Sequence, residues 1–356
     1  FSSFATVPLS GTVTAYGHVS GAAPDWEFTF TAQQGTVMDV PFDTITGTLR
    51  GSSLHIEIPG VTWKYVDGTQ QARGMVDLST RDIRLSVQTS HMRLERFLPL
   101  AGKGDLPLTG WLDNQVDLEG TLDDLKASGS IHLTDGSAYG YLYKEVSTAY
   151  SLKNGVVTIS NGNIYAYQSH ISFYGTAGDT LAIHVDSPDI DIARALPKEK
   201  LPRSGTLGIS AYIGGTPSSP TAVGSVTAKN LVINHIPITE LKGDFGYYGG
   251  IVRLTDFHFK QNDGVYDANG SWNPSSGWIM TRASVHDGDI ESAIKLFNLP
   301  LQKISGKIDG NVSIDGTVKN PRGKIAGQIT QAVMDGYSVE PADIDIQLED
   351  GVIKVN

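Results

Sequence analysis

The sequence lacks cysteine, long apolar runs and clusters of basic residues, and each absence narrows the class of protein. Without cysteine there are no disulfides, no thiolate metal sites and no cysteine nucleophile. No apolar run approaches the roughly 20 residues of a membrane-spanning helix. The net charge of −11, with no basic cluster, argues against nucleic acid as a partner, because phosphate contacts need grouped lysine and arginine.

Catalytic and metal-binding patterns are missing as well. The GxSxG, Walker and dinucleotide fingerprints do not occur, and the nine histidines show no spacing typical of zinc ligands. The acids Asp186, Asp189 and Asp191 leave a Ca²⁺ site open, but a solvated loop before a capped helix explains them better. We therefore predict no metal, no cofactor and no enzymatic activity.

Glycine is abundant, with 40 residues, and its spacing reveals an internal repeat. A Ser-Gly or Thr-Gly pair recurs at Gly11, Gly110, Gly205 and Gly306, at intervals of 99, 95 and 101 residues. Another glycine lies ten residues after each of these, and in the last three copies a threonine follows it. Landmarks that keep register over copies of this length are typical of an array of similar structural units.

We expect three full repeats over residues 1–100, 101–200 and 201–300, and a partial fourth over 301–356. Each complete repeat ends in a Leu-Pro pair, and no long linker separates neighbouring copies. The repeats are therefore expected to form one continuous array. Because the sequence opens at Phe1 and stops within a strand-like segment, we also expect it to be a piece of a longer protein.

Within each repeat, apolar and polar residues alternate with a period of two, and turn dipeptides separate the alternating segments. Successive side chains of a strand point to opposite faces, so the pattern predicts an antiparallel sheet with one apolar and one wet face. The expected lining of the apolar face is mainly aliphatic: Leu54, Ile56, Ile83, Leu85, Val87, Val157, Ile159, Ile171, Phe173, Ile183, Val185, Leu207, Ile209, Val226, Val252, Leu254, Ile344, Ile346 and Leu348.

Helical periodicity is confined to the ends of the repeats, at residues 91–98, 189–196 and 287–299. Asp189, and Asp287 or Asp289, are the expected N-caps of the last two segments. The apolar side chains of these helices either cap one end of the sheet face or act as a gate that moves aside. The residues concerned are Leu94, Phe97, Ile192, Ile290, Ile294 and Phe297.

An apolar sheet face must be covered by something. A second sheet can pack on it, the sheet can close into a barrel, or the sheet can curl and leave a groove for a ligand. The continuous repeat and the aliphatic composition favour the groove, since an aliphatic ligand fits such a surface. We predict an all-β fold in which one elongated, continuous antiparallel sheet curls into a β-taco or groove, with short helices at the repeat ends.

One ordered set of motifs recurs in the third and fourth copies. It runs through Ser204-Gly205-Thr206-Leu207, Gly215-Thr216-Pro217, Pro220 and Gly224, and again through Ser305-Gly306, Gly316-Thr317, Pro321 and Gly323. The set resembles the TamB branch of the AsmA-like envelope proteins, which belong with the bridge-like lipid-transfer proteins of β-taco or repeating β-groove form. The first copy departs from this pattern, because no threonine follows Gly21.

The resemblance implies a periplasmic protein of the bacterial cell envelope, anchored in the inner membrane by segments outside this chain and reaching the outer membrane. The implied ligand is phospholipid or another acyl-chain lipid, conducted along the groove in support of outer-membrane biogenesis. An outer-membrane partner of the Omp85 class is also implied.

Two other classes of protein have long repetitive β sequences. Right-handed β-helix polysaccharide lyases have coils of about 20–25 residues, far shorter than the spacing found here. A surface adhesin built of stacked β-sandwiches would have a similar period, and it is the alternative that the sequence leaves open.

Overall fold

The computed structural model describes residues 9–21, 25–37, 39–100, 102–121, 124–195, 203–233, 235–292, 304–317, 320–349 and 352–355. These residues form 23 strands and few helical turns. The chain divides into two compact units. Unit 1 comprises residues 1–166 and 172–178, and unit 2 comprises residues 167–171 and 179–356.

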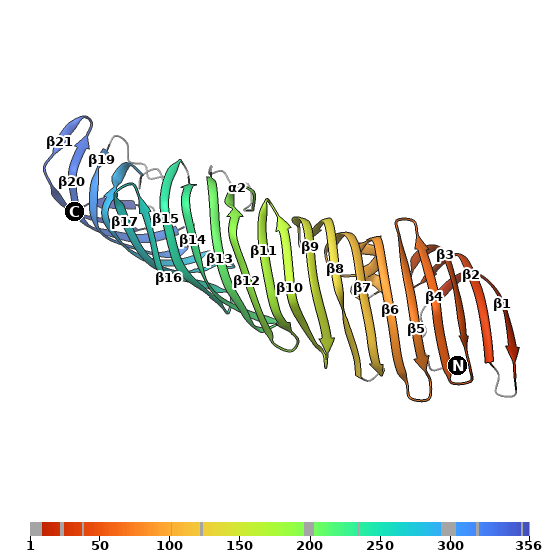
Figure 1. Ribbon diagram of the computed structural model, residues 1–356. Coiled ribbons are helices and arrows are strands. Elements are labelled where there is room, and N and C mark those ends of the chain that lie inside the picture. Colours follow the sequence, from red (N-terminus) through yellow and green to blue (C-terminus); the bar gives the residue numbers. More distant parts are fainter. Residues whose placement is uncertain are drawn as a thin grey trace. The chain divides into compact units, whose positions relative to one another are not determined.

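Each unit is an antiparallel meander in which most consecutive strands pair, and in unit 2 β20 pairs with both β21 and β22 (Figure 1). The strands up to the unit boundary are β1 (Leu9–Ser20), β2 (Asp25–Val37), β3 (Val40–Gly51), β4 (His55–Tyr65), β5 (Gly68–Asp77), β6 (Asp82–Arg93), β7 (Leu108–Thr121), β8 (Asp124–Ala138), β9 (Tyr141–Lys153), β10 (Val156–Ala166) and β11 (Ser169–Ala177). The others are β12 (Leu181–Asp191), β13 (Arg203–Thr216), β14 (Ser219–Ile233), β15 (Ile236–Tyr248), β16 (Ile251–Gln261), β17 (Gly264–Asn273), β18 (Trp278–Asp289), β19 (Ile304–Thr317), β20 (Asn320–Met334), β21 (Tyr337–Val339), β22 (Ala342–Glu349) and β23 (Val352–Val355).

The predicted fold class is confirmed within each unit. Both are built of antiparallel strands, and among the described strands of either unit the pairing does not close into a barrel. Six strands precede each helical segment: β1–β6, β7–β12 and β13–β18. The unit boundary falls at β11 and does not coincide with an expected repeat boundary.

The three helical segments begin later than expected. Helix α1 covers Leu94–Leu100, α2 covers Ile192–Ala195, and residues 290–292 are helical where the described segment ends. The acids expected to start the last two helices lie in strands β12 and β18. The expected residues 91–93 likewise belong to β6.

Only one of the expected N-caps is correct. Asp289 accepts a hydrogen bond from the backbone N–H of Ser292 at 2.9 Å. Asp191 caps α2 by accepting from the N–H of Ala193, also at 2.9 Å. The sequence could not separate these acids from Asp189 and Asp287, because all of them stand within one turn of an apolar helical pattern.

The four glycines of the Ser/Thr-Gly pairs occupy the same structural position. Gly11, Gly110, Gly205 and Gly306 lie at β-bulges in β1, β7, β13 and β19, with φ between +108° and +143°. A residue with a Cβ rarely adopts this conformation, so the bulge explains why glycine recurs there. Bulges bend a strand and increase its twist. Because the four bulges occupy equivalent positions, the sheet bends at the same point of the first strand in each copy of the repeat.

The Gly-Thr pairs lie at the opposite end of the same strands. Each of the three threonines accepts a hydrogen bond from the backbone N–H three residues later, at 3.1–3.2 Å. The bonds join Thr121 to Asp124, Thr216 to Ser219 and Thr317 to Asn320. The threonine hydroxyl therefore stabilises the turn to the next strand.

Fully buried side chains are few, and they gather near the helices. In unit 1 one cluster includes Phe42, Val61 and Met92, and a second joins Leu94, Leu98 and Leu112. In unit 2, Ile192 packs with Ala228, Leu231 and Ile238. Most of the remaining sheet is exposed or partly exposed, so the hydrogen-bonded ladder carries much of the structure.

We predict that Gly110→Ala destabilises unit 1 by about 1–3 kcal/mol, because φ is +138° and a Cβ would lie 3.0 Å from the carbonyl oxygen of Thr134. Urea unfolding followed by circular dichroism measures the change. Gly60→Ala is the control, since Gly60 has no positive φ and no atom lies within 4 Å of its added Cβ. Equal losses in both variants would contradict the role assigned to the bulge.

Candidate functional site

The strand register places the predicted lining residues of unit 2 on one face of its sheet. Directly paired residues of an antiparallel ladder share a face. One cross-strand row contains Val185, Ala211, Gly224, Phe245, Leu254, Gly270, Thr281, Ile314, Gly323 and Leu348. The rows beside it hold the remaining predicted residues from β12 to β22: Ile183, Leu207, Ile209, Val226, Val252, Ile344 and Ile346. We call this surface the apolar face.

Unit 1 has an equivalent apolar face. Val87 and Ile159 belong to one row with Ala72, Val116, Gly129 and Tyr150. Leu85 and Val157 belong to the next, and Ile56 and Ile83 to a third. The ring of Phe173 lies over Gly162, which belongs to the same face. Ile171, which belongs to unit 2, is two residues before Phe173 in β11, so strand alternation gives the two side chains the same direction.

Leu54 is the exception among the predicted lining residues. It lies in the bend between β3 and β4 and is exposed, although the alternation Leu54, Ile56, Ile58 predicts that it belongs to a strand. The strand begins one residue later, at His55. Alternation alone does not mark that boundary, because Leu54 has the right spacing without the ladder pairing.

Sequence reasoning missed several residues of the apolar face. Phe245, Phe257 and Trp272 pair directly with recognised positions or belong to the same rows. Their own segments are rich in glycine or interrupted by a bulge, so a period of two is not visible there. Cross-strand register is the signal that would have found them, and it is available only once the pairing is known.

The middle of the apolar face is not sealed. Val185, Ile209, Val226, Ile346 and Leu348 are all partly exposed. Leu254 keeps 37% of its surface exposed and Trp272 keeps 46%. A core packed between two sheets buries such side chains almost completely, as Leu231 is at 2% beside α2.

The apolar character of the face also affects its tyrosines. Burial raises the pKa of Tyr150 in unit 1 and of Tyr266 in unit 2. Tyr266 stacks on Phe259 with 4.4 Å between ring centroids, and its hydroxyl donates a hydrogen bond to Gln261 at 3.0 Å. These shifts indicate an environment that disfavours charge.

Three of the residues expected to cap or gate the face belong to its buried clusters or pack against them. Leu94 and Ile192 are buried, Phe97 packs on both clusters of unit 1, and Ile290 is partly exposed. Ile294 and Phe297 lie outside the described residues. These contacts fit a cap at one end of the face, and whether the helices move remains a prediction.

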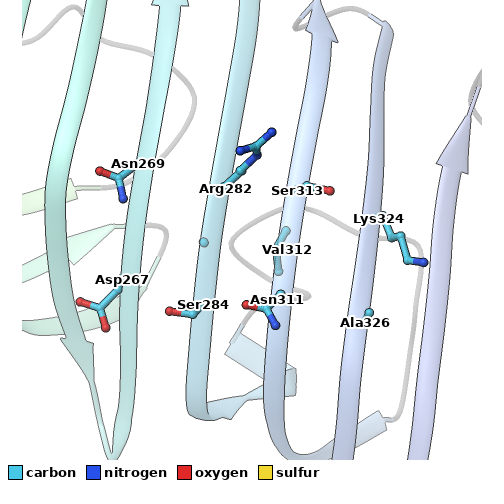
Figure 2. A pocket seen from close by; sticks show the side chains of 10 residues that line it. Asp267, Asn269, Arg282, Ser284, Asn311, Val312, Ser313, Lys324 and Ala326 are labelled. Carbon is cyan, nitrogen blue, oxygen red and sulfur yellow. The ribbon is translucent and has the colours of Figure 1, made fainter.

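The opposite face carries most of the charge, and we call it the polar face. Lys324 pairs with Asp345 at 2.8 Å, and its hydrogen bond lowers the pKa of that carboxyl. Arg322 pairs with Asp315 at 3.0 Å. A hollow of about 480 Å³ opens among polar side chains that include Asp267, Ser284 and Asn311 (Figure 2). Tyr212, Val223 and Met280 are exposed on this face too, so it is not wholly polar.

Within the described ranges, no group of three or more histidine and acidic side chains could hold a metal ion. Of the acids considered for Ca²⁺, Asp191 caps α2, and Asp189 accepts a hydrogen bond from the N–H of His170 at 3.3 Å. Among the helices that the structure describes, none is long and apolar enough to cross a membrane.

No protein-family model, no curated protein and no solved structure matches this chain.

The absence of native cysteine makes single-cysteine labelling a direct test of the open face. We predict that Leu254→Cys reacts with a water-soluble maleimide within about tenfold of the rate of Arg253→Cys on the polar face. Leu231→Cys should react roughly a hundredfold more slowly, because reaction there needs local opening. A rate for Leu254→Cys as low as that for Leu231→Cys would show that the apolar face is covered.

Proposed function

We propose that the chain holds the acyl chains of phospholipid or a related lipid along its apolar face. The observation that supports this proposal is the continuity of that face, which crosses strand after strand from β12 to β22 without a second sheet on it in the described residues. No catalytic role is assigned to any residue.

The energetics suit a mobile lipid. Burying an acyl chain gains roughly 0.8 kcal/mol per CH₂ group, so a lipid leaves water readily for an aliphatic surface. Neighbouring rows offer similar side chains, such as Val185 beside Ile183 and Ile346 beside Leu348. A chain that slides from one row to the next therefore exchanges similar contacts, which keeps the barrier to movement low.

The wider setting of the proposal is the cell envelope. The motifs that resemble the TamB branch fall at equivalent places, with the glycine of each Ser/Thr-Gly pair at a bulge and each Gly-Thr pair at a turn. On this basis we propose non-enzymatic transport of lipid across the periplasm, in support of outer-membrane biogenesis. Membrane anchoring, and contact with an Omp85-class protein, would come from segments outside this chain.

A β-sandwich adhesin is the second candidate. It requires an inner face buried between two sheets in each module, and the partial exposure of Ile209, Leu254 and Ile346 disfavours that arrangement. The lipid proposal is consistent with this exposure, because acyl chains would cover these side chains when lipid is bound.

Photocrosslinking tests the lipid proposal directly. A photoreactive residue at Ile159, Phe173, Leu254 or Ile346 is expected to form adducts with phospholipid, because these side chains lie on the apolar face. Mass spectrometry of the irradiated protein, produced in a Gram-negative host, detects the adducts. The controls are Thr158 and Arg253, which are exposed on the polar face next to Ile159 and Leu254. Equal yields on both faces would contradict the proposal.

A charge placed on the apolar face should remove lipid while the fold is kept. We expect Leu254→Asp to lower the bound phospholipid at least about threefold, because a carboxylate among acyl chains is poorly solvated. Ile209→Arg is expected to act in the same way. Lipid extraction and native mass spectrometry measure the loss, circular dichroism checks the fold, and Arg253→Asp is the control. Unfolding without a selective loss of lipid would indicate a sealed core.

A further inference from the structure

Strand β1 has one edge without a described partner. It pairs with β2 along its length, and among the described strands of unit 1 none pairs with its other side. Its apolar side chains are well exposed, at 65% for Val13, 77% for Tyr16 and 61% for Val19. An open strand edge presents free backbone N–H and C=O groups that can pair with another strand.

The equivalent strands of the later copies have both edges occupied. β7, β13 and β19 carry the same glycine bulge as β1, and each pairs with the sixth strand of the copy before it. These sixth strands are β6, β12 and β18. In each pairing the register shifts within the sixth strand, close to the bulged glycine of its partner. The shifts lie at Thr89/Met92, Ser187/Ile190 and Val285/Gly288. The chain thus contains the same strand pairing three times.

The helix that follows a sixth strand covers part of the next first strand. Leu94 and Leu98 of α1 bury Leu112 of β7 to 2% exposure, and Ile192 of α2 packs with Leu207 of β13. Both covered residues lie two positions after the bulged glycine. Val13 has that position in β1, and its side chain is exposed.

β1 also lacks the features by which proteins protect an exposed edge. Its sequence contains no proline and no lysine, and His18 is its only titratable side chain apart from Tyr16. Lysine and proline on an edge strand discourage strand addition, so the sequence of β1 contains neither of these protections against a partner strand.

We propose that the open edge of β1 binds a strand–helix segment from a further copy of this repeat. The segment would add antiparallel to β1 and bring its apolar side chains onto the apolar face. If the added segment adopts the register of β6 on β7, its residue equivalent to Met92 lies opposite Val13. Its residue equivalent to Val87 lies opposite Gly17. Its helix covers Val13 as α1 covers Leu112. The proposal rests on the repeated pairing and not on lipid binding, so either can fail alone.

The test uses the whole chain and a synthetic peptide with the sequence of residues 82–98. Hydrogen exchange measured by mass spectrometry should slow about tenfold over residues 9–20 when the peptide is saturating, while residues 108–121 are unchanged. A peptide with Leu94→Asp and Leu98→Asp should bind at least about tenfold more weakly, because it cannot cover Val13. Val13→Lys in the protein should weaken binding to a similar degree.

Val352→Lys is the matched control, because Val352 is an exposed apolar residue on a strand at the other end of the chain. It should leave peptide binding unchanged. Unaltered exchange over residues 9–20 would overturn the proposal. Equal binding of the peptide that carries Leu94→Asp and Leu98→Asp would also overturn it. A dimer of the chain that forms through β1 without peptide would also overturn it, since the occupant would then be a second copy of the chain.

Discussion

The structure depends on strand register, because register decides which side chains share a face. Each bulge inserts a residue that would move the rest of its strand to the wrong face if the ladder did not shift with it. In β16 the ladder moves from Leu254 to Phe257 while its partner moves from Gly270 to Ala268, and all four remain on the apolar face. The same correction occurs in β4, where Ile58 and Val61 are paired with Gly74 and Ala72. The sheet can therefore bend without losing its two-sided character.

Stability is unevenly distributed over this sheet. The buried clusters lie near the helices, where Met92, Leu112 and Leu231 are almost inaccessible to water. Toward the Gly-Thr turns the strands are held by ladder hydrogen bonds and turn contacts such as that of Thr216. Local opening should be easier there than beside the helices, because few apolar contacts must be broken. Under the lipid proposal, acyl chains that enter the apolar face at this end would leave the buried clusters beside the helices undisturbed.

The fold could be predicted from the sequence because its signals are local and repeated. Alternation identified Ile183, Val185 and their neighbours, and turn glycines separated the strands. The boundary at Leu54 and the caps at Asp191 and Asp289 could not be predicted, since neighbouring residues satisfy the same local pattern. Trp272 was missed because its place on the apolar face comes from cross-strand pairing, which a single strand does not encode.

The six-strand repeat has a consequence for length. Strands are spaced by about 4.8 Å, so six of them advance the ladder by roughly 29 Å in the direction of its hydrogen bonds. Since β7, β13 and β19 present the same bulge and the same face, duplicating or deleting one repeat changes the extent of the array by that increment and leaves the join intact. Such a sheet can gain or lose strands in whole repeats during evolution, because every join between copies uses the same strand pairing.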